Sequence, residues 1–192
     1  MYGTDELRQH CWIHAREAFG TSHIFQRRIR GPRRGLKWVT YLGLAIPLAI
    51  GLLVLGFGLG AQPVARALPY AAALLVVQGL VALWALVGSW QSRVDDGLLS
   101  ITENNRLSTA YRDLATRAPL DLETRIAILD PQYQARSELD LRQGVTDVEK
   151  RVGMRAALRQ FASPCAACGQ VPSSMVPTSC GVCGDFPRRL SS

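Results

Sequence analysis

Four of the five cysteines fall into two identical pairs near the end of the chain. Cys165 and Cys168 enclose two residues, Cys180 and Cys183 do the same, and eleven residues separate the two pairs. Two tight turns that each present two thiolates suit a tetrahedral Zn²⁺ ion. Because all four ligands are cysteines, no coordination position stays open for a catalytic water. The spacing predicts a structural zinc site.

Two other interpretations of these cysteines are weaker. Disulfide bonds need an oxidising compartment, and the charge distribution described below places this tail in the cytosol. A redox-active CxxC pair normally follows a strand of a βαβ unit, and no such pattern precedes Cys165.

The fifth cysteine, Cys11, lies on an apolar helical face and is expected to be buried. His10 and His14 have a spacing that metal ligands use, but no third ligand is near them in the sequence, so no metal is predicted there.

Two long runs without any charged residue or histidine span residues 38–60 and 70–90. At 1.5 Å per residue, each run forms a helix of about 30–35 Å, which is enough to cross a bilayer. Most of the 22 Lys and Arg residues lie before the first run or after the second, and only Arg66 lies between the two. The positive-inside rule therefore predicts a two-span protein with both termini in the cytoplasm.

Much of the net charge of +7 comes from a basic run just before the first span. Anionic lipid attracts such a run, and the positive-inside rule alone would produce it. The alternative is a phosphate-binding ring formed when several copies assemble, because arginine forks suit phosphates. The candidate ligand-binding residues are Arg27, Arg28, Arg30, Arg33, Arg34 and Lys37.

Small and polar residues form one stripe on the second span: Gln78, Ala82, Ala85 and Ser89. Gln78 is the strongly polar residue near the middle of the span, and it must face protein or water rather than lipid. The stripe is either a helix-packing surface or the lining of a pore. Two helices cannot enclose a pathway, so transport would require an oligomer.

The rest of the chain is predicted to be helical. A first helix is expected over residues 4–19, with Gly20 ending it. The second span is expected to continue as a cytosolic stalk as far as Pro119. Asp130 and Pro131 resemble the start of another helix, and Thr146 with Glu149 matches a capping box.

The predicted fold is an all-α membrane protein: a two-helix transmembrane hairpin with cytosolic helices and a small C-terminal zinc ribbon. Its expected parts are 1–37, a helix and the basic run; 38–90, the hairpin; 91–162, the cytosolic helices; and 163–192, the zinc-binding tail. No P-loop, GxSxG or HExxH motif is present, so the chain is not expected to be an enzyme.

This order of parts, together with the CxxCx11CxxC tail, resembles the mobilome CxxCx(11)CxxC proteins of bacterial mobile elements. It is also similar to the two-span SLATT-type effectors of prokaryotic defence loci, and among these to the membrane effectors of Hailong anti-phage systems. In Hailong systems a nucleotidyltransferase makes single-stranded DNA oligomers that hold a tetrameric, channel-like effector inactive until infection.

The resemblance implies a homo-oligomeric effector, suspected to be a tetramer, in the bacterial inner membrane. Its expected activity is an ion channel or membrane disruption that ends in abortive infection. Its expected partners are membrane lipid and a cytosolic nucleotide or single-stranded DNA oligomer made by a partner nucleotidyltransferase. The alternative is a membrane-anchored zinc-ribbon adaptor that docks a protein or nucleic acid without conductance.

Overall fold

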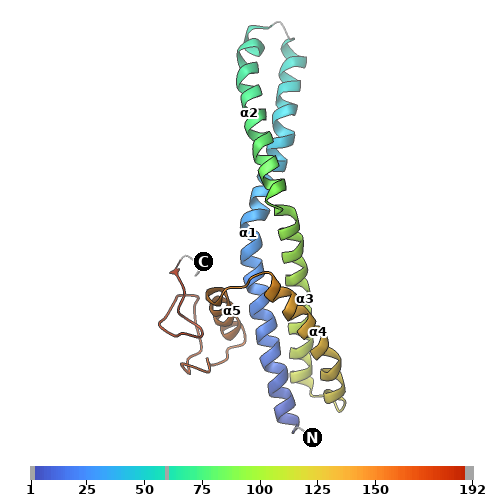
Figure 1. Cartoon of the computed structure of the whole chain (residues 1–192), viewed down its shortest axis with the longest axis vertical. Coiled ribbons are helices and arrows are strands. Elements are labelled where there is room, and N and C mark those ends of the chain that lie inside the picture. The colour runs from blue at the N-terminus through green and yellow to red at the C-terminus, as the bar shows by residue number, and fades with distance from the viewer. Residues whose placement is uncertain (1–2, 59–60, 189–192) are drawn as a thin grey trace. The chain divides into compact units, whose positions relative to one another are not determined.

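The computed structural model describes residues 3–58 and 61–188, and within these ranges it contains five α-helices and no strand (Figure 1). The helices are α1 (Thr4–Phe57), α2 (Gln62–Val87), α3 (Trp90–Arg117), α4 (Leu122–Arg142) and α5 (Asp147–Gln160). The chain divides into two compact units. The head unit comprises Met1–Arg28 and Gly97–Ser192, and the hairpin unit comprises Ile29–Asp96. The prediction of an all-helical fold is confirmed.

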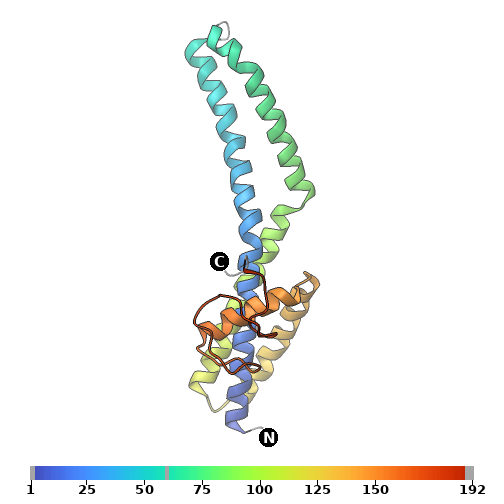
Figure 2. The same cartoon turned by 90° about the vertical axis from the view of Figure 1, so that its left-hand side faces the viewer.

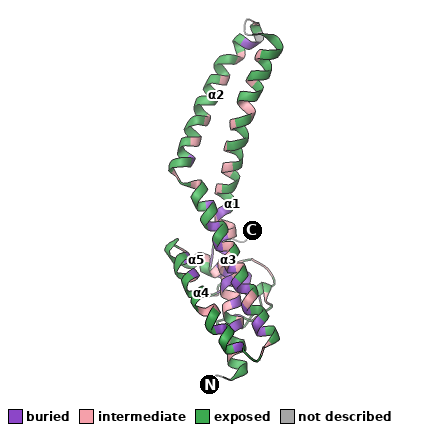
Figure 3. Cartoon of the chain, turned by 90° about the vertical axis from the view of Figure 1, so that its right-hand side faces the viewer, coloured by how far each residue is buried: buried purple, intermediate pink, exposed green. Residues whose placement is uncertain are grey.

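In the hairpin unit, α2 returns beside the second half of α1 (Figures 1 and 2). Both helices contain stretches that are long and apolar enough to cross a membrane. Their large apolar side chains are mostly exposed (Figure 3): Leu55 is 85% exposed and Leu86 is 75% exposed. An isolated hairpin of two helices has too little surface to bury these residues against itself.

The head unit has its own apolar core, formed where α1, α3 and α4 pack together. Cys11 and Ala15 contribute from α1, Leu107 and Tyr111 from α3, and Ile126 from α4. All five are at most 5% exposed. The expectation that Cys11 is a buried small residue is therefore confirmed.

Four sequence-based helix predictions are confirmed or corrected by the structure. The second span does not continue unbroken into the stalk, because α2 ends at Val87 and α3 begins at Trp90, with Ser89 at a φ of +51°. The stalk helix α3 then ends at Arg117, just before Pro119, as expected. Thr146 caps α5 in a full capping box: its hydroxyl accepts from the Glu149 amide, and the Glu149 carboxylate accepts from the Thr146 amide. The helix predicted to begin after Asp130 begins earlier, at Leu122, and Pro131 lies inside it. Asp130 is not a cap, because its carboxylate accepts a hydrogen bond from the Tyr111 hydroxyl instead.

The predicted end of the first helix at Gly20 is wrong, because α1 continues to Phe57. Gly20 has another role in the structure, where it faces Gly153 of α5. A Cβ atom at Gly20 would lie 2.9 Å from the Gly153 carbonyl oxygen. This glycine therefore permits a close helix crossing rather than ending the helix. The helix also passes through Gly31 and Pro32 without a break.

Candidate functional site

The four paired cysteines come together at one point of the head unit. The Cys165 and Cys180 Sγ atoms are 4.0 Å apart, and those of Cys168 and Cys183 are 3.8 Å apart. All four sulfur atoms lie within 4.8 Å of one another. Four thiolates about 2.3 Å from one central ion, at the corners of a tetrahedron, would be about 3.8 Å apart. These residues are therefore placed to hold a metal ion such as zinc.

Backbone hydrogen bonds shape the turn that carries each pair. The Gly169 amide donates to the Cys165 carbonyl at 2.8 Å, and the Gly184 amide donates to the Cys180 carbonyl at 2.9 Å. Gly169 has a φ of +68°, which an L side chain rarely adopts. A Cβ atom at Gly184 would lie 1.8 Å from the Thr178 Oγ1 atom. Each CxxC pair thus ends in a glycine that the local geometry requires.

The electrostatic environments of the four thiols differ. The backbone N–H groups of Cys183 and Val182 lower the pKa of Cys180 to about 6. Burial raises the pKa of Cys183, so on its own this thiol stays protonated. Metal binding releases such protons, because the thiolate is the ligand. A cation at the centre of the cluster would hold all four sulfurs in the ionised form.

Helix α5 positions the cysteine cluster. Leu158 packs against Cys165 and Cys183 in a small apolar core. Arg155, only 6% exposed, donates to the Ser174 carbonyl at 2.8 Å and to the Cys183 carbonyl at 3.2 Å. Sequence reasoning missed this arginine, since one more arginine on an amphipathic helix gives no signal of its own. Arg155 links the tail to α5 through these two backbone carbonyls.

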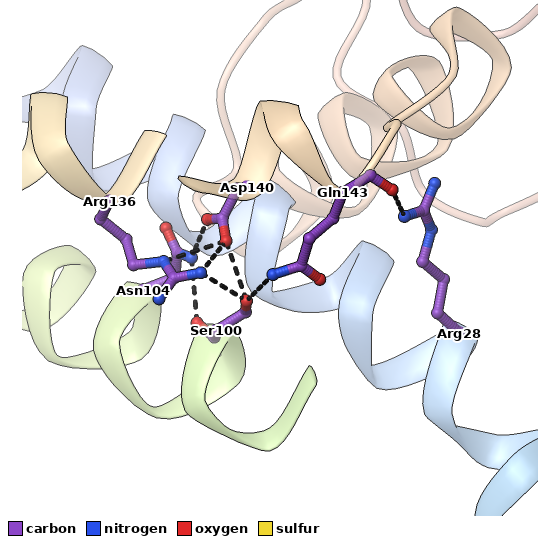
Figure 4. A network of polar contacts seen from close by, with 6 residues as sticks. All are labelled: Arg28, Ser100, Asn104, Arg136, Asp140 and Gln143. Carbon is purple, nitrogen blue, oxygen red and sulfur yellow. Dashed lines mark hydrogen bonds and ion pairs between the residues drawn. The ribbon is translucent and has the colours of Figure 1, made fainter. Parts of the chain in front are cut away.

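One residue of the predicted basic site has a structural role. The Arg28 guanidinium donates to both Glu149 carboxylate oxygens at 2.6 Å and to the Gly144 carbonyl at 2.7 Å. It also donates to the Gln143 carbonyl at 2.8 Å (Figure 4). Burial alone would raise the pKa of Glu149, but hydrogen bonds from Arg28 and Thr146 outweigh it and lower the pKa to about 2. Arg28 therefore fixes the α4–α5 connection to α1.

The other basic residues are arranged differently. Arg27 is half-buried beside a cavity of about 210 Å³ that Ile24 and Val152 also line. The following four side chains are exposed, and no hydrogen bond or ion pair joins them to another residue in the described part of the chain. These four are Arg30, Arg33, Arg34 and Lys37.

The small-residue stripe of α2 lies partly against α1 within the hairpin unit. A side chain at Gly43 would meet the Gln78 Nε2 atom at 2.8 Å. The Gln78 Oε1 atom is buried and has no hydrogen-bond partner among the described residues. Ala85 is 5% exposed, and with Ala82 and Ser89 it lines a cavity that Leu36 and Val39 of α1 also line. Ser89 lies in the turn after α2, with a φ of +51°, so the predicted helical stripe ends at Ala85.

A buried polar network in the head unit has no counterpart among the sequence predictions (Figure 4). The Asp140 carboxylate accepts from the Ser100 hydroxyl at 2.8 Å, from the Asn104 amide at 2.6 Å and from the Arg136 guanidinium. The Asp140 side chain is buried, with only 3% of the residue exposed. The signal in the sequence was two pairs at i and i+4, Ser100 with Asn104 and Arg136 with Asp140.

Comparison with known proteins identifies the family. No curated protein and no solved structure shows a significant match to the chain. A family model described as "Mobilome CxxCx(11)CxxC protein" matches residues 8–186. The match spans residues of both units and includes all four clustered cysteines. The chain belongs to the mobilome CxxCx(11)CxxC family.

Proposed function

We propose that this protein is an oligomeric effector of a bacterial anti-phage system that acts in the inner membrane and is controlled by a cytosolic nucleotide or single-stranded DNA oligomer. The observation that carries the proposal is a free basic stripe on α1, next to the apolar part of the same helix. Arg30, Arg33, Arg34 and Lys37 are spaced i, i+3, i+4 and i+7, which places them on one helix face.

The apolar surface of the hairpin unit supports insertion into a bilayer. Leu44, Leu55 and Leu86 are 72%, 85% and 75% exposed. Exposing apolar surface to water costs about 25 cal/mol per Å², and a large contiguous patch marks contact with lipid or protein. Two such helices joined by a short connection suit a spanning hairpin with both termini in the cytoplasm. The same apolar surface offers contacts for further copies of the chain.

The basic stripe suits a polyanionic ligand. Its side chains have no partner within the described chain, so their donors are available to phosphate oxygens. Copies arranged around an axis would repeat the stripe and multiply the attraction. A single-stranded DNA oligomer carries a row of phosphates that could contact several subunits at once. This is how we propose that the ligand controls the state of the oligomer.

We further propose that the metal held by the four cysteines is Zn²⁺ and that its role is structural. Four thiolates close the coordination shell, which leaves no site for a metal-bound nucleophile. Over residues 163–187 the tail that carries them forms turns and bends but no helix or strand, and its apolar core is small. Metal binding would supply the folding free energy that this core lacks.

The proposal is tested by ion efflux from vesicles that contain the purified full-length chain. Short oligodeoxythymidylates serve as the ligand probe. The test variant replaces Arg30, Arg33, Arg34 and Lys37 with Gln. The control variant replaces four exposed arginines of the head unit, Arg112, Arg117, Arg142 and Arg159, with Gln. We expect the oligomer to change efflux by the parent and by the control but not by the test variant. Efflux that is insensitive to the probe in all three would refute ligand control.

A second candidate function is an anchored adaptor without conductance, and one observation favours it. The Gln78 side chain lies against Gly43 of α1 inside the hairpin, so its polar group does not face outward to line a pathway. An adaptor would bind the oligonucleotide through the basic stripe yet produce no efflux under any condition. The same vesicles decide between the two functions, because binding and efflux are measured on one sample.

A further inference from the structure

A second group of metal-ligand side chains lies in the head unit, where α1 and α4 pack together. His10 and His14 are one turn apart on α1, and Asp130 is on α4. Their ligand atoms lie within 4.8 Å of one another, and all three residues are half-buried. The chain has only three histidines, and two of them are in this group. None of the four clustered cysteines belongs to it.

One nitrogen in this group lacks a hydrogen bond. The His10 Nε2 atom is shielded from solvent and has no hydrogen-bond partner among the described residues. It lies 3.4 Å from the Asp130 Oδ1 atom, which is close enough for an ion pair but not aligned as a hydrogen bond. Buried polar atoms without a partner are rare in proteins and call for an explanation such as a bound ion.

Neighbouring side chains orient the second histidine. The His14 Nδ1 atom is 3.2 Å from the Glu17 carboxylate, which also accepts from the Tyr133 hydroxyl at 2.8 Å. A carboxylate oxygen at this distance accepts from the ring N–H of His14. The Nδ1 atom of His14 is therefore the donor, and its Nε2 atom keeps a free lone pair. A carboxylate behind a histidine is the usual arrangement around bound zinc.

The aspartate is oriented in the same way. The Tyr111 hydroxyl donates to the Asp130 Oδ1 atom at 2.7 Å. Cys11, next to His10 in the sequence, is not part of this group, because its side chain is fully buried in the apolar core of the head unit. His14 is thus held by a hydrogen bond to Glu17, and Asp130 by a hydrogen bond from Tyr111. Each of the three residues offers an atom that can bind a metal ion.

We propose that His10, His14 and Asp130 bind a divalent transition metal ion, for which Zn²⁺ is the probe, at a site distinct from the four-cysteine cluster. Two imidazoles and one carboxylate suit ions of intermediate softness such as Zn²⁺. Three protein ligands leave one coordination position open to water or to an added ligand. The ion would join α1 to α4, and this proposal does not depend on the proposed membrane function.

The spacing of the three side chains fits this ion. Ligand atoms about 2.0–2.1 Å from a tetrahedral zinc would be about 3.3 Å apart. The His10 and Asp130 atoms are already 3.4 Å apart. The group as a whole, within 4.8 Å, needs side-chain movements of about an ångström to close around the ion.

The experiment counts bound metal in the full-length chain, purified in detergent with the four-cysteine site loaded. Zn²⁺ is added and the ions per chain are counted by native mass spectrometry. Co²⁺ loading provides a second readout, because thiolate-to-cobalt absorption reports the cysteine site alone. The test variants are His14→Gln and Asp130→Asn. The matched control is His23→Gln, which removes the third histidine, located on the same helix.

We expect the parent and His23→Gln to bind a second ion and the two test variants to bind only one, with thiolate absorption unchanged in all four proteins. Glu17→Gln removes a positioning residue, and we expect it to lower the affinity for the second ion about 10–100-fold without abolishing binding. The proposal is overturned if the parent binds a single ion, or if the test variants retain the second. A melting temperature that falls in His14→Gln while the parent shows one ion would mean that the histidine only stabilises the fold.

Discussion

Arg28 shows how a residue with the properties of a ligand-binding group can serve the fold instead. Its guanidinium makes hydrogen bonds to Glu149, Gln143 and Gly144. Glu149 in turn caps α5 through the backbone amide of Thr146. This single ion pair therefore connects the N-terminal helix, the α4–α5 connection and the helix that holds the cysteine cluster. Neutralising Arg28 would disturb the head unit whatever the protein binds.

The Arg28–Glu149 pair predicts an acid-dependent loss of stability. The folded-state pKa of Glu149 is lowered from 4.5 to about 2, so its stabilising contribution is complete above pH 4.5 and is lost as the pH falls through about 2. We expect Glu149→Gln to reduce the free energy of unfolding by about 2 kcal/mol at neutral pH, with a smaller difference from the parent at lower pH. Urea unfolding of the full chain in detergent, followed from pH 7 to the acid limit, measures this.

The control for this prediction is Asp147→Asn, in the same helical turn. Asp147 pairs with Lys150, but its side chain is 83% exposed, so we expect little change in stability. A constant gap between the parent and Glu149→Gln at every pH would contradict the assigned role of the pair.

At this scale, local spacing predicted the cysteine cluster but not the histidine group. The four cysteines are two short motifs, and each motif contains its own turn residues, so the sequence shows them directly. Asp130 is too far from His10 along the sequence for the two to form a recognisable motif. Only the packing of α4 on α1 brings them together. The role of Arg28 depends on a partner just as remote.

At the scale of elements, α1 and α5 cross at two glycines. A Cβ atom at Gly153 would lie 2.7 Å from the Gly20 carbonyl oxygen and 2.9 Å from the Ile24 Cδ1 atom. Because the first of these contacts is with backbone, the helices would have to move apart. Since α5 also holds the cysteine cluster, this crossing sets the position of the tail on the head unit.

The crossing predicts that Gly153→Ala is destabilising, although alanine favours helices. We expect a loss of about 1–3 kcal/mol, because the added methyl group forces a backbone shift. The matched control is Gly31→Ala, also within a helix, where an added Cβ atom meets nothing within 4 Å. There we expect no loss, and a gain of up to about 1 kcal/mol from helix propensity. Thermal unfolding of both variants checks this, and equal melting temperatures would refute the close crossing.

Sequence signals predicted helix ends correctly where residues of the same segment form the hydrogen bonds at the helix end. They failed where a contact with another helix determines the role of the residue. The capping box at Thr146 and the stop before Pro119 were predicted, since side chains of the same segment produce them. Gly20 and Asp130 look like end signals, but their partners lie elsewhere, on α5 and on α3. The continuity of α1 could therefore not be predicted from its own residues.

In the molecule as a whole, the two units differ in how much apolar surface they expose. The head unit buries its apolar residues in a core of its own, whereas the hairpin unit exposes large apolar residues along both helices. The composition of the two apolar runs predicted this contrast. The number of copies that assemble, and the ligand that meets the basic stripe, depend on contacts outside a single chain, so sequence patterns alone do not specify them.

Native mass spectrometry of the full-length protein, extracted from bacterial membranes in mild detergent, tests whether the chain forms a ligand-bound oligomer. It reports the number of subunits and the mass of any co-purifying ligand in one spectrum. We predict a closed oligomer from the membrane fraction that carries the mass of a nucleotide or a short DNA oligomer, and that loses this mass when Arg30, Arg33, Arg34 and Lys37 are replaced with Gln. A monomer without bound ligand would contradict the proposed function.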